Sequence, residues 1–228
     1  MLVIGLAGRM RSGKNTFAEY LNGMYGSHYN IRMFSFAKAL KQEINEWYER
    51  YESWPQTFAA VHKQVPGGLP DWVVKEDSPD MTDPDSPYGK QRTLLQFWGV
   101  YRREQSVNYW VKQLAKQVLE SRSDIALITD CRFLNEVRWI KSLGREGIIV
   151  KIVREGQVID TANEHISEKA LDGYEFDYTI SSISVEELQT QADEFMELVE
   201  NRERFPEGFI DFTQEGLEAV LRENNNEE

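Results

Sequence analysis

The chain has 228 residues, 41% of them hydrophobic, and a formal net charge of −12 at pH 7. This length and hydrophobic content suffice to bury one substantial core, so we expect one domain with room for an appended subdomain. The acidic balance argues against stable nucleic-acid binding, because nucleic-acid phosphates attract basic surfaces.

Cysteine usage and hydropathy indicate the compartment. Cys131 is the single cysteine, which excludes an intramolecular disulfide and is typical of a reducing environment. The sequence holds no apolar run near the roughly 20 residues that a membrane helix requires. We therefore expect a cytoplasmic protein without membrane contact.

The N-terminal segment carries the most informative pattern. Residues 3–7 form an apolar run suited to a buried strand, and Gly8 and Gly13 then bracket four residues before Lys14, the spacing GxxxxGK. Glycine suits a loop whose backbone N–H groups wrap a polyphosphate, because it adopts positive φ and places no Cβ near the oxygens. The following helix N-terminus adds a partial positive charge and Lys14 a full one. The pattern predicts a nucleoside triphosphate site; the alternative is a glycine-rich turn with a chance lysine.

The residue after Lys14 departs from the usual motif. A serine or threonine commonly stands there as a magnesium ligand, whereas this chain has Asn15 and then Thr16. Two interpretations stay open: Thr16 serves the metal through water, or Asn15 offers its amide oxygen. The expected nucleotide-binding residues are Gly8, Arg11, Ser12, Gly13, Lys14, Asn15 and Thr16.

Helical and strand periodicities alternate after this loop. Helices are expected over residues 15–24, 37–51, 91–103, 106–121, 133–143 and 185–200, and strands over residues 31–36, 125–129, 148–153 and 178–180. This alternation predicts an α/β fold, a three-layer sandwich with a central parallel sheet and helices on both faces.

Residues 52–89 break the alternation. Six of the seven prolines fall there, so we interpret this stretch as a long insertion or a lid, partly mobile. Residues 154–168 follow the fourth strand and are expected to form a lid. Residues 203–228 are expected to form an acidic C-terminal tail.

The strand expected over residues 125–129 leads into Asp130 and Arg132. Ligands of open parallel sheets lie beyond the carboxyl ends of the strands, so we expect both side chains at the same crevice as Gly8. Arg132 can offer a planar fork to phosphate oxygens, and Asp130 can order the water shell of Mg²⁺ or fix that arginine. The alternative is structural: Asp130 pairs with Arg132 or caps the next helix. Glu136, one helical turn on, would clamp Arg132 or lie on a solvated face.

Other motifs favour a small kinase among phosphate-loop proteins. The sequence has no NKxD for guanine recognition and no DxxG followed by a water-positioning glutamine. The third strand leads into Asp130 and Cys131, whereas a molecular motor would carry an Asp-Glu pair there.

Five segments carry a wider pattern: GRMRSGKNT at 8–16, FSFAKALK at 34–41, TLLQFWGVYRREQSVNYWV at 93–111, ITDCRFLNE at 128–136 and EHISE at 164–168. They resemble, in the same order, segments of bacteriophage deoxynucleoside monophosphate kinases. The likeness covers about residues 1–200 apart from the proline-rich insertion. It implies a P-loop nucleotide kinase domain over residues 1–202 that transfers the γ-phosphate of ATP, with Mg²⁺, to a deoxynucleoside monophosphate in the host cytoplasm. It also suggests a homodimer.

The resemblance implies roles for individual residues. The expected catalytic residues are Lys14, Asp130, Arg132 and Arg154, with Thr16 and Asp130 near Mg²⁺. The expected acceptor-binding residues are Lys38, Gln96, Gly99, Arg102, Arg103, Trp110 and Glu136. Asn15 stands where the family more often has aspartate, and Val100 where it usually has threonine. Trp110 would stack on a base or, as aromatic residues at helical spacing usually do, pack in the core.

Two other functions stay open from the sequence. A related P-loop kinase acting on a modified nucleotide or another small acceptor would carry the same loop. A nucleotide-sensing module would hold ATP without turning it over, which Asn15 favours. The acidity of the chain argues against an acceptor within DNA.

Overall fold

A computed structural model of the chain describes residues 1–74, 92–157 and 169–201. Two compact units divide the chain: the sheet unit, Met1–Phe36 with Val111–Glu228, and the helical unit, Ala37–Trp110. Each unit is described by itself. The predicted tail, residues 75–89 of the predicted insertion and most of the predicted lid lie outside the described residues.

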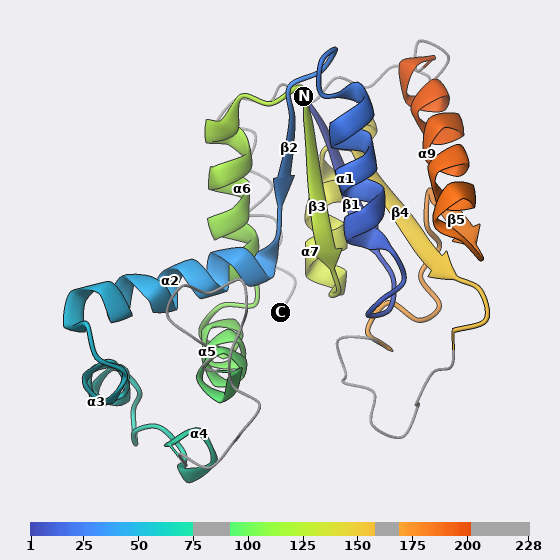
Figure 1. Cartoon of the computed structure of the whole chain (residues 1–228). Helices are drawn as coiled ribbons and strands as arrows, with labels where there is room; N and C mark the ends of the chain where they lie inside the picture. The colour runs from blue at the N-terminus through green and yellow to red at the C-terminus, as the bar shows by residue number, and fades with distance from the viewer. Residues whose placement is uncertain (75–91, 158–168, 202–228) are drawn as a thin grey trace. The chain divides into compact units, whose positions relative to one another are not determined.

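The sheet unit is built on five parallel strands in the order β2-β3-β1-β4-β5 (Figure 1). The strands are β1 (Leu2–Ala7), β2 (Ile31–Phe34), β3 (Ile125–Cys131), β4 (Gly147–Arg154) and β5 (Tyr178–Ser182). Every residue of β1 is buried, as expected for a parallel strand covered on both faces. The predicted α/β fold with a parallel central sheet is confirmed.

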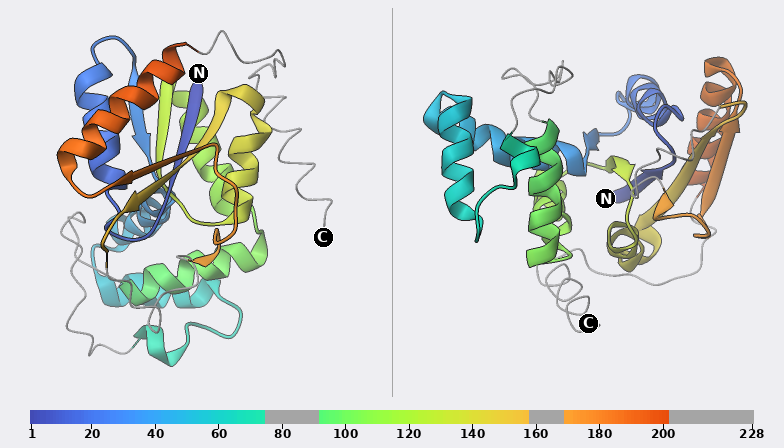
Figure 2. Two further views of the ribbon diagram at one scale, coloured as in Figure 1. Left: turned by 90° about the vertical axis from the view of Figure 1, so that its right-hand side faces the viewer. Right: turned by 90° about the horizontal axis from the view of Figure 1, so that it is seen from below.

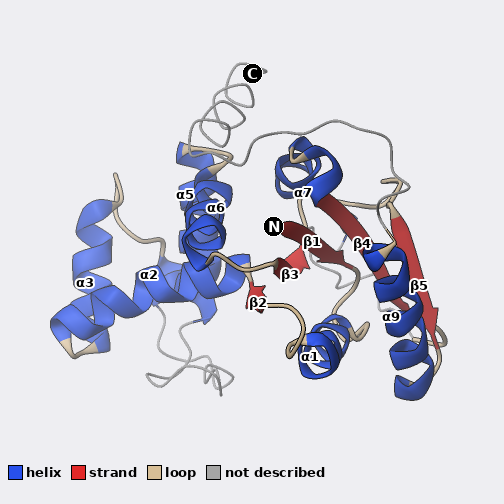
Figure 3. Ribbon diagram, turned by 90° about the horizontal axis from the view of Figure 1, so that it is seen from above, coloured by secondary structure: helices blue, strands red, loops and turns tan. Residues whose placement is uncertain are grey.

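Helices lie on both faces of this sheet (Figure 3). Helices α1 (Lys14–Tyr25) and α9 (Val185–Glu200) cover one face, and α7 (Leu134–Ser142) covers the other. A short 3-10 helix, Gly144–Glu146, leads from α7 into β4. The core between the sheet and helices α1 and α9 contains Ile4, Leu6, Phe17, Leu21, Leu127, Val150, Ile152, Ile180, Leu188 and Phe195.

One carboxylate joins the two helices on that face. Asp193 of α9 accepts hydrogen bonds from the hydroxyls of Tyr20 and Tyr25 in α1, both at 2.8 Å. Burial, and then the hydrogen bond and charge of Asp193, raise the pKa of Tyr25 to about 12. Both tyrosines therefore remain protonated donors at neutral pH, and they hold the helix that carries Lys14 at its N-terminus.

The described part of the helical unit contains helices and no strand (Figure 2). They are α2 (Phe36–Tyr51), α3 (Trp54–Gln64), α4 (Asp71–Val74) and α5 (Arg92–Gln105), and α6 (Tyr109–Ser121) begins at its end. Residues 52–74 of the expected insertion carry two helices, α3 and α4, which the sequence pattern does not predict. Pro55 falls in the first turn of α3, where its missing N–H costs no hydrogen bond, so here proline starts a helix.

The described residues include no helix that is both long and apolar enough to cross a membrane.

The junction of the 3-10 helix and β4 leaves no room for a side chain at Gly147. A Cβ there would lie 1.8 Å from the carbonyl oxygen of Ile140, a backbone atom that moves only with α7. We expect Gly147→Ala to lower the free energy of unfolding by about 2 kcal/mol or more. Urea denaturation of the native chain and the variant measures the difference.

Gly23→Ala is the matched control for that substitution. Gly23 lies in α1, is exposed, and its added Cβ would meet no atom within 4 Å. Alanine is the better helix former, so we expect a change between zero and about 1 kcal/mol of stabilisation. Equal stabilities for the two variants would contradict the described junction.

Candidate functional site

The loop between β1 and α1 has a backbone that only certain residues adopt. Three of its residues have positive φ: 139° at Gly8, 64° at Arg11 and 100° at Gly13. A Cβ on Gly8 would lie 2.3 Å from the carbonyl oxygen of Ile152 in β4. Glycine is thus required at position 8 for space as well as for conformation, and the loop passes directly beside β4.

Lys14, the first residue of α1, folds its side chain back over this loop. Its ammonium donates to the carbonyl oxygens of Gly8 and Arg9, both at 2.6 Å, and to the hydroxyl of Ser12 at 3.4 Å. Ser12 is buried, and its backbone N–H donates to the Arg9 carbonyl at 3.2 Å. The loop therefore encloses a full positive charge next to the N-terminus of a helix, the arrangement that favours an anion.

Asp130, near the end of β3, contacts the start of another helix. One carboxylate oxygen accepts the backbone N–H of Phe36, the first residue of α2, at 2.8 Å. The structural alternative that Asp130 caps the helix directly after it is wrong, because Phe133 is the N-cap of α7. Asp130 satisfies a backbone donor from a segment distant in the sequence.

Glu136 fills the capping role at α7. One of its carboxylate oxygens accepts the backbone N–H groups of Arg132 at 2.7 Å and of Phe133 at 3.1 Å. Only 2% of the residue is exposed, so the alternative of a solvated face is wrong. A glutamate at the third helical position reaches back to the orphan donors of the first turn, and here it fixes the backbone at Arg132.

Cys131 lies in the sequence between Asp130 and Glu136. It does not have the character of a reactive nucleophile. Its side chain is buried, and that burial, with the charges of Glu136 and Asp130, raises the pKa of the thiol well above its ordinary value. The thiol stays protonated at neutral pH and fills space beside the loop.

A pocket of about 180 Å³ lies beside the loop, at the carboxyl ends of β3 and β4. Its charged lining residues are Arg9, Arg132, Lys151, Arg154 and Asp172, and Gly8, Ser12, Gln157, Leu171 and Phe176 also line it. Four cations and one carboxylate give it a positive balance in a chain whose net charge is −12. Of the residues expected at the site, the structure places Gly8, Ser12, Arg132 and Arg154 at one pocket, whereas Lys14 and Asp130 are not among its lining residues.

Three further contacts hold the walls of this pocket. The guanidinium of Arg9 lies 3.6 Å from a carboxylate oxygen of Asp172. The side-chain amide of Gln157 donates to the Met10 carbonyl at 2.8 Å. The ammonium of Lys151 lies 5.2 Å from the ring centroid of Phe176. Sequence reasoning missed these residues; the one signal was the lysine that interrupts the apolar run of β4, GIIVKIV.

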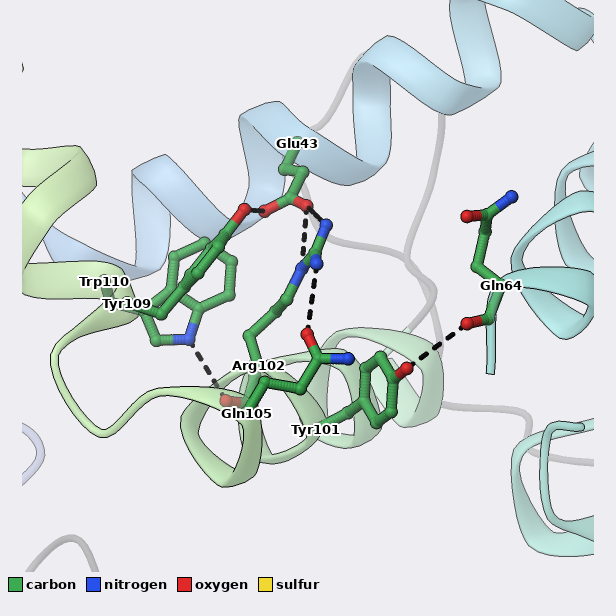
Figure 4. A network of polar contacts seen from close by, with 8 residues as sticks. Glu43, Gln64, Tyr101, Arg102, Gln105, Tyr109 and Trp110 are labelled. Atoms are coloured by element: carbon green, nitrogen blue, oxygen red, sulfur yellow. Dashed lines mark hydrogen bonds and ion pairs between the residues drawn. The ribbon is translucent and has the colours of Figure 1, made fainter. Parts of the chain in front are cut away.

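The residues expected to bind an acceptor lie mostly in the helical unit, where Glu43 of α2 organises a network (Figure 4). Glu43 accepts from Nε of Arg102 at 3.0 Å and from its Nη2, and from the Tyr109 hydroxyl at 3.0 Å. Nη1 of Arg102 donates to Gln105 at 3.2 Å. The guanidinium carbon also lies 4.5 Å from the ring centroid of Trp98 and 4.7 Å from that of Tyr109. Arg102 is thus engaged within the unit by two side chains that accept its hydrogen bonds, Glu43 and Gln105, and by two ring contacts.

The carbonyl of Gly99 accepts two side-chain hydrogen bonds within the helical unit. It accepts from the indole N–H of Trp110 at 3.1 Å and from Nη1 of Arg103 at 3.2 Å. Trp110 is 2% exposed, so it packs in the core, the alternative to base stacking. Gln96 and Lys38 are exposed, and Val100 is 51% exposed.

The two candidate metal contacts lie on different elements. Thr16 is half-buried in the first turn of α1, next to the exposed Asn15, whereas Asp130 lies on β3. Within residues 1–74, 92–157 and 169–201, no group of three or more His, Cys, Asp or Glu side chains gathers as a metal site.

Comparison with known proteins returned no match, either among protein-family models or among curated sequences.

Asp172 is the one carboxylate among the described residues that line the pocket. We expect Asp172→Asn to tighten binding of inorganic tripolyphosphate by about twofold, because it releases Arg9 from a partly exposed ion pair, an interaction of only about 0.5 kcal/mol. Calorimetric titration measures the affinity, and the gain shrinks at high salt.

Glu120→Gln makes the same change in net charge away from the pocket. Glu120 forms an exposed pair with Lys116 on α6, 3.9 Å apart. Its variant is expected to bind tripolyphosphate as the native chain does. An equal gain in both variants would assign the effect to overall charge rather than to Asp172.

Proposed function

We propose that this chain is a P-loop nucleotide kinase that transfers the γ-phosphate of ATP to a deoxynucleoside monophosphate, in the presence of Mg²⁺. The observation that supports this most is the loop of residues 8–13, with the Lys14 ammonium over it and a cation-lined pocket beside it. The resemblance of five segments to the phage kinases supports the acceptor class. The product diphosphate would serve nucleotide supply.

The loop would hold the donor. Phosphoryl transfer needs two phosphates held in line and the charge of the transferring group neutralised, with little covalent help from the protein. Gly8 to Gly13 would present backbone N–H groups to the phosphates, and Lys14 would exchange the carbonyl oxygens of Gly8 and Arg9 for phosphate oxygens. This exchange is favourable because a charged acceptor binds an ammonium more strongly than a carbonyl does.

Magnesium would be held mainly by the phosphates themselves. The ion keeps several waters and takes few protein oxygens, so one hydroxyl and one carboxylate suffice. Thr16 and Asp130 are the candidates, with the carboxylate acting through water. When bound, the ion would neutralise charge on the phosphate oxygens.

Arginines would bind the group in transfer. Arg132 and Arg154 line the pocket from the ends of β3 and β4, and a guanidinium matches two phosphate oxygens at once. Lys38, Gln96 and Arg103 of the helical unit are proposed for the acceptor. Arg102 is the weaker candidate there, because Glu43 and Gln105 already take its N–H groups.

A binding module that holds ATP without turnover is the second candidate. Asn15 favours it, since an amide stands, exposed, where the phage kinases more often have a carboxylate. The two proposals differ in one measurable property: whether ADP release depends on an acceptor.

The deciding assay follows ADP release with each of the four deoxynucleoside monophosphates. We expect at least one to raise the rate about a hundredfold or more over ATP alone, since positioning the acceptor supplies most of the catalysis. Flat rates together with tight ATP binding would support the binding module, and absence of ATP binding would contradict both proposals.

Lys14→Ala tests the donor site. We expect kcat to fall about a thousandfold, because one charge aimed at the transferring phosphate is lost. The unfolding free energy should change by less than about 2 kcal/mol, since the ammonium donates to Gly8, Arg9 and Ser12 of the adjoining loop and a typical hydrogen bond contributes only about 1 kcal/mol.

Lys116→Ala is the matched control, because Lys116 is exposed on α6 and, among the described residues, its ion pair is with Glu120. It should keep native kinetics. Full activity of Lys14→Ala would contradict the assigned loop.

A further inference from the structure

We propose that Lys151 is a further phosphate-binding residue of this site, one that no motif of the chain assigns. The inference rests on the proposed function and names an additional residue for it. Four observations carry it: the position of Lys151 beside the loop, its half-buried place in an apolar strand, the lack of a carboxylate partner for it among the described residues, and the cations around it.

The strand register puts Lys151 next to the start of the loop. Ala7, the residue before Gly8, pairs with Cys131 of β3 on one side and with Lys151 of β4 on the other. Arg132 follows Cys131, so Arg132 and Lys151 flank the point where β1 becomes the loop. Both line the pocket.

The fold does not require a cation at this position. Lys151 is half-buried between Val150 and Ile152, which are fully buried, in a strand that pairs on both sides. Removing a charge from water is unfavourable unless a partner compensates. A methionine would fill the same space without that penalty. We therefore infer that the lysine at position 151 serves to bind a ligand.

The contacts of Lys151 leave its charge unneutralised. Its ammonium faces the ring of Phe176 at 5.2 Å, and no carboxylate in the described parts of the chain lies within ion-pair distance of it. Arg154, on the same strand, likewise forms no ion pair there. These charges share a pocket with Arg132, so they repel one another until an anion enters.

A phosphate group is the anion that suits this arrangement. It carries several oxygens and more than one negative charge, and the adjoining loop is shaped for phosphates. Lysine binds phosphate as a point charge on a flexible stem, so the ammonium can leave the Phe176 ring for an oxygen within the pocket. The phosphate could belong to the donor or to the acceptor, and kinetics separates them.

The test compares K151M, K151Q and K151R with the native chain and with K116Q, an exposed control. Calorimetry with inorganic tripolyphosphate should give about tenfold weaker binding for K151M and K151Q, and a change within about threefold for K151R. K116Q should match the native chain. Thermal unfolding without ligand should give K151M a midpoint at or above the native one, because a purely apolar side chain suits the strand.

Steady-state kinetics then identifies the phosphate. A rise in the KM for ATP with the KM for the monophosphate unchanged assigns Lys151 to the donor, and the reverse assigns it to the acceptor.

Two results would overturn the inference without touching the proposed function: native tripolyphosphate affinity in K151M while Lys14→Ala loses binding, or failure of both K151M and K151Q to fold, which would make Lys151 structural. Unchanged affinity in Lys14→Ala as well would overturn the proposed function itself.

Discussion

The parallel pairing of β1 with β3 on one side and with β4 on the other is the constraint on which the site depends. It sets Ala7 level with Cys131 and Lys151, so the three chains reach the same edge of the sheet together. The loop that leaves β1 then passes so close to the Ile152 carbonyl that only glycine fits at position 8. Strand pairing thus fixes the loop, and the loop fixes where Lys14 places its charge.

Local charge, rather than net charge, governs what this site can bind. The chain carries twelve more acidic than basic residues, yet the described lining of the pocket holds four cations and one carboxylate. Clefts with walls of low dielectric constant concentrate the field of the charges that line them. In the free protein, the positive charges at the loop and pocket contact neighbouring groups. Lys14 donates to carbonyl oxygens, Lys151 faces an aromatic ring, and Arg9 pairs with Asp172. Each of these partners is weaker than a phosphate, so an anion can replace them.

The sequence predicted the parts of the site whose signal is local. The glycine spacing identified the loop, and the apolar runs located the strands and hence Arg132 and Arg154 at their ends. It did not predict contacts between distant segments. The Asp130 carboxylate accepts a hydrogen bond from the backbone N–H of Phe36, 94 positions away, and no pattern in the sequence near Asp130 predicts that partner. Lys151 was not predicted as a site residue, because an apolar run with a single charge still predicts only a strand. The sequence did not predict α3, because proline interrupts a helix in its interior but is also common in the first turn, where Pro55 lies.

Arg102 and Arg103 show how tertiary partners separate residues that the sequence leaves equal. Adjacent on α5, they differ by about 100° around the helix, which is enough to give them different neighbours. Arg102 faces Glu43, and its guanidinium also contacts the rings of Trp98 and Tyr109, so it joins α5 to α2 and to the start of α6. Arg103 reaches back along its own helix to the Gly99 carbonyl. Loss of activity on replacing Arg102 would therefore report a loosened helical unit first, and unfolding measurements must accompany kinetics before either arginine is assigned to an acceptor.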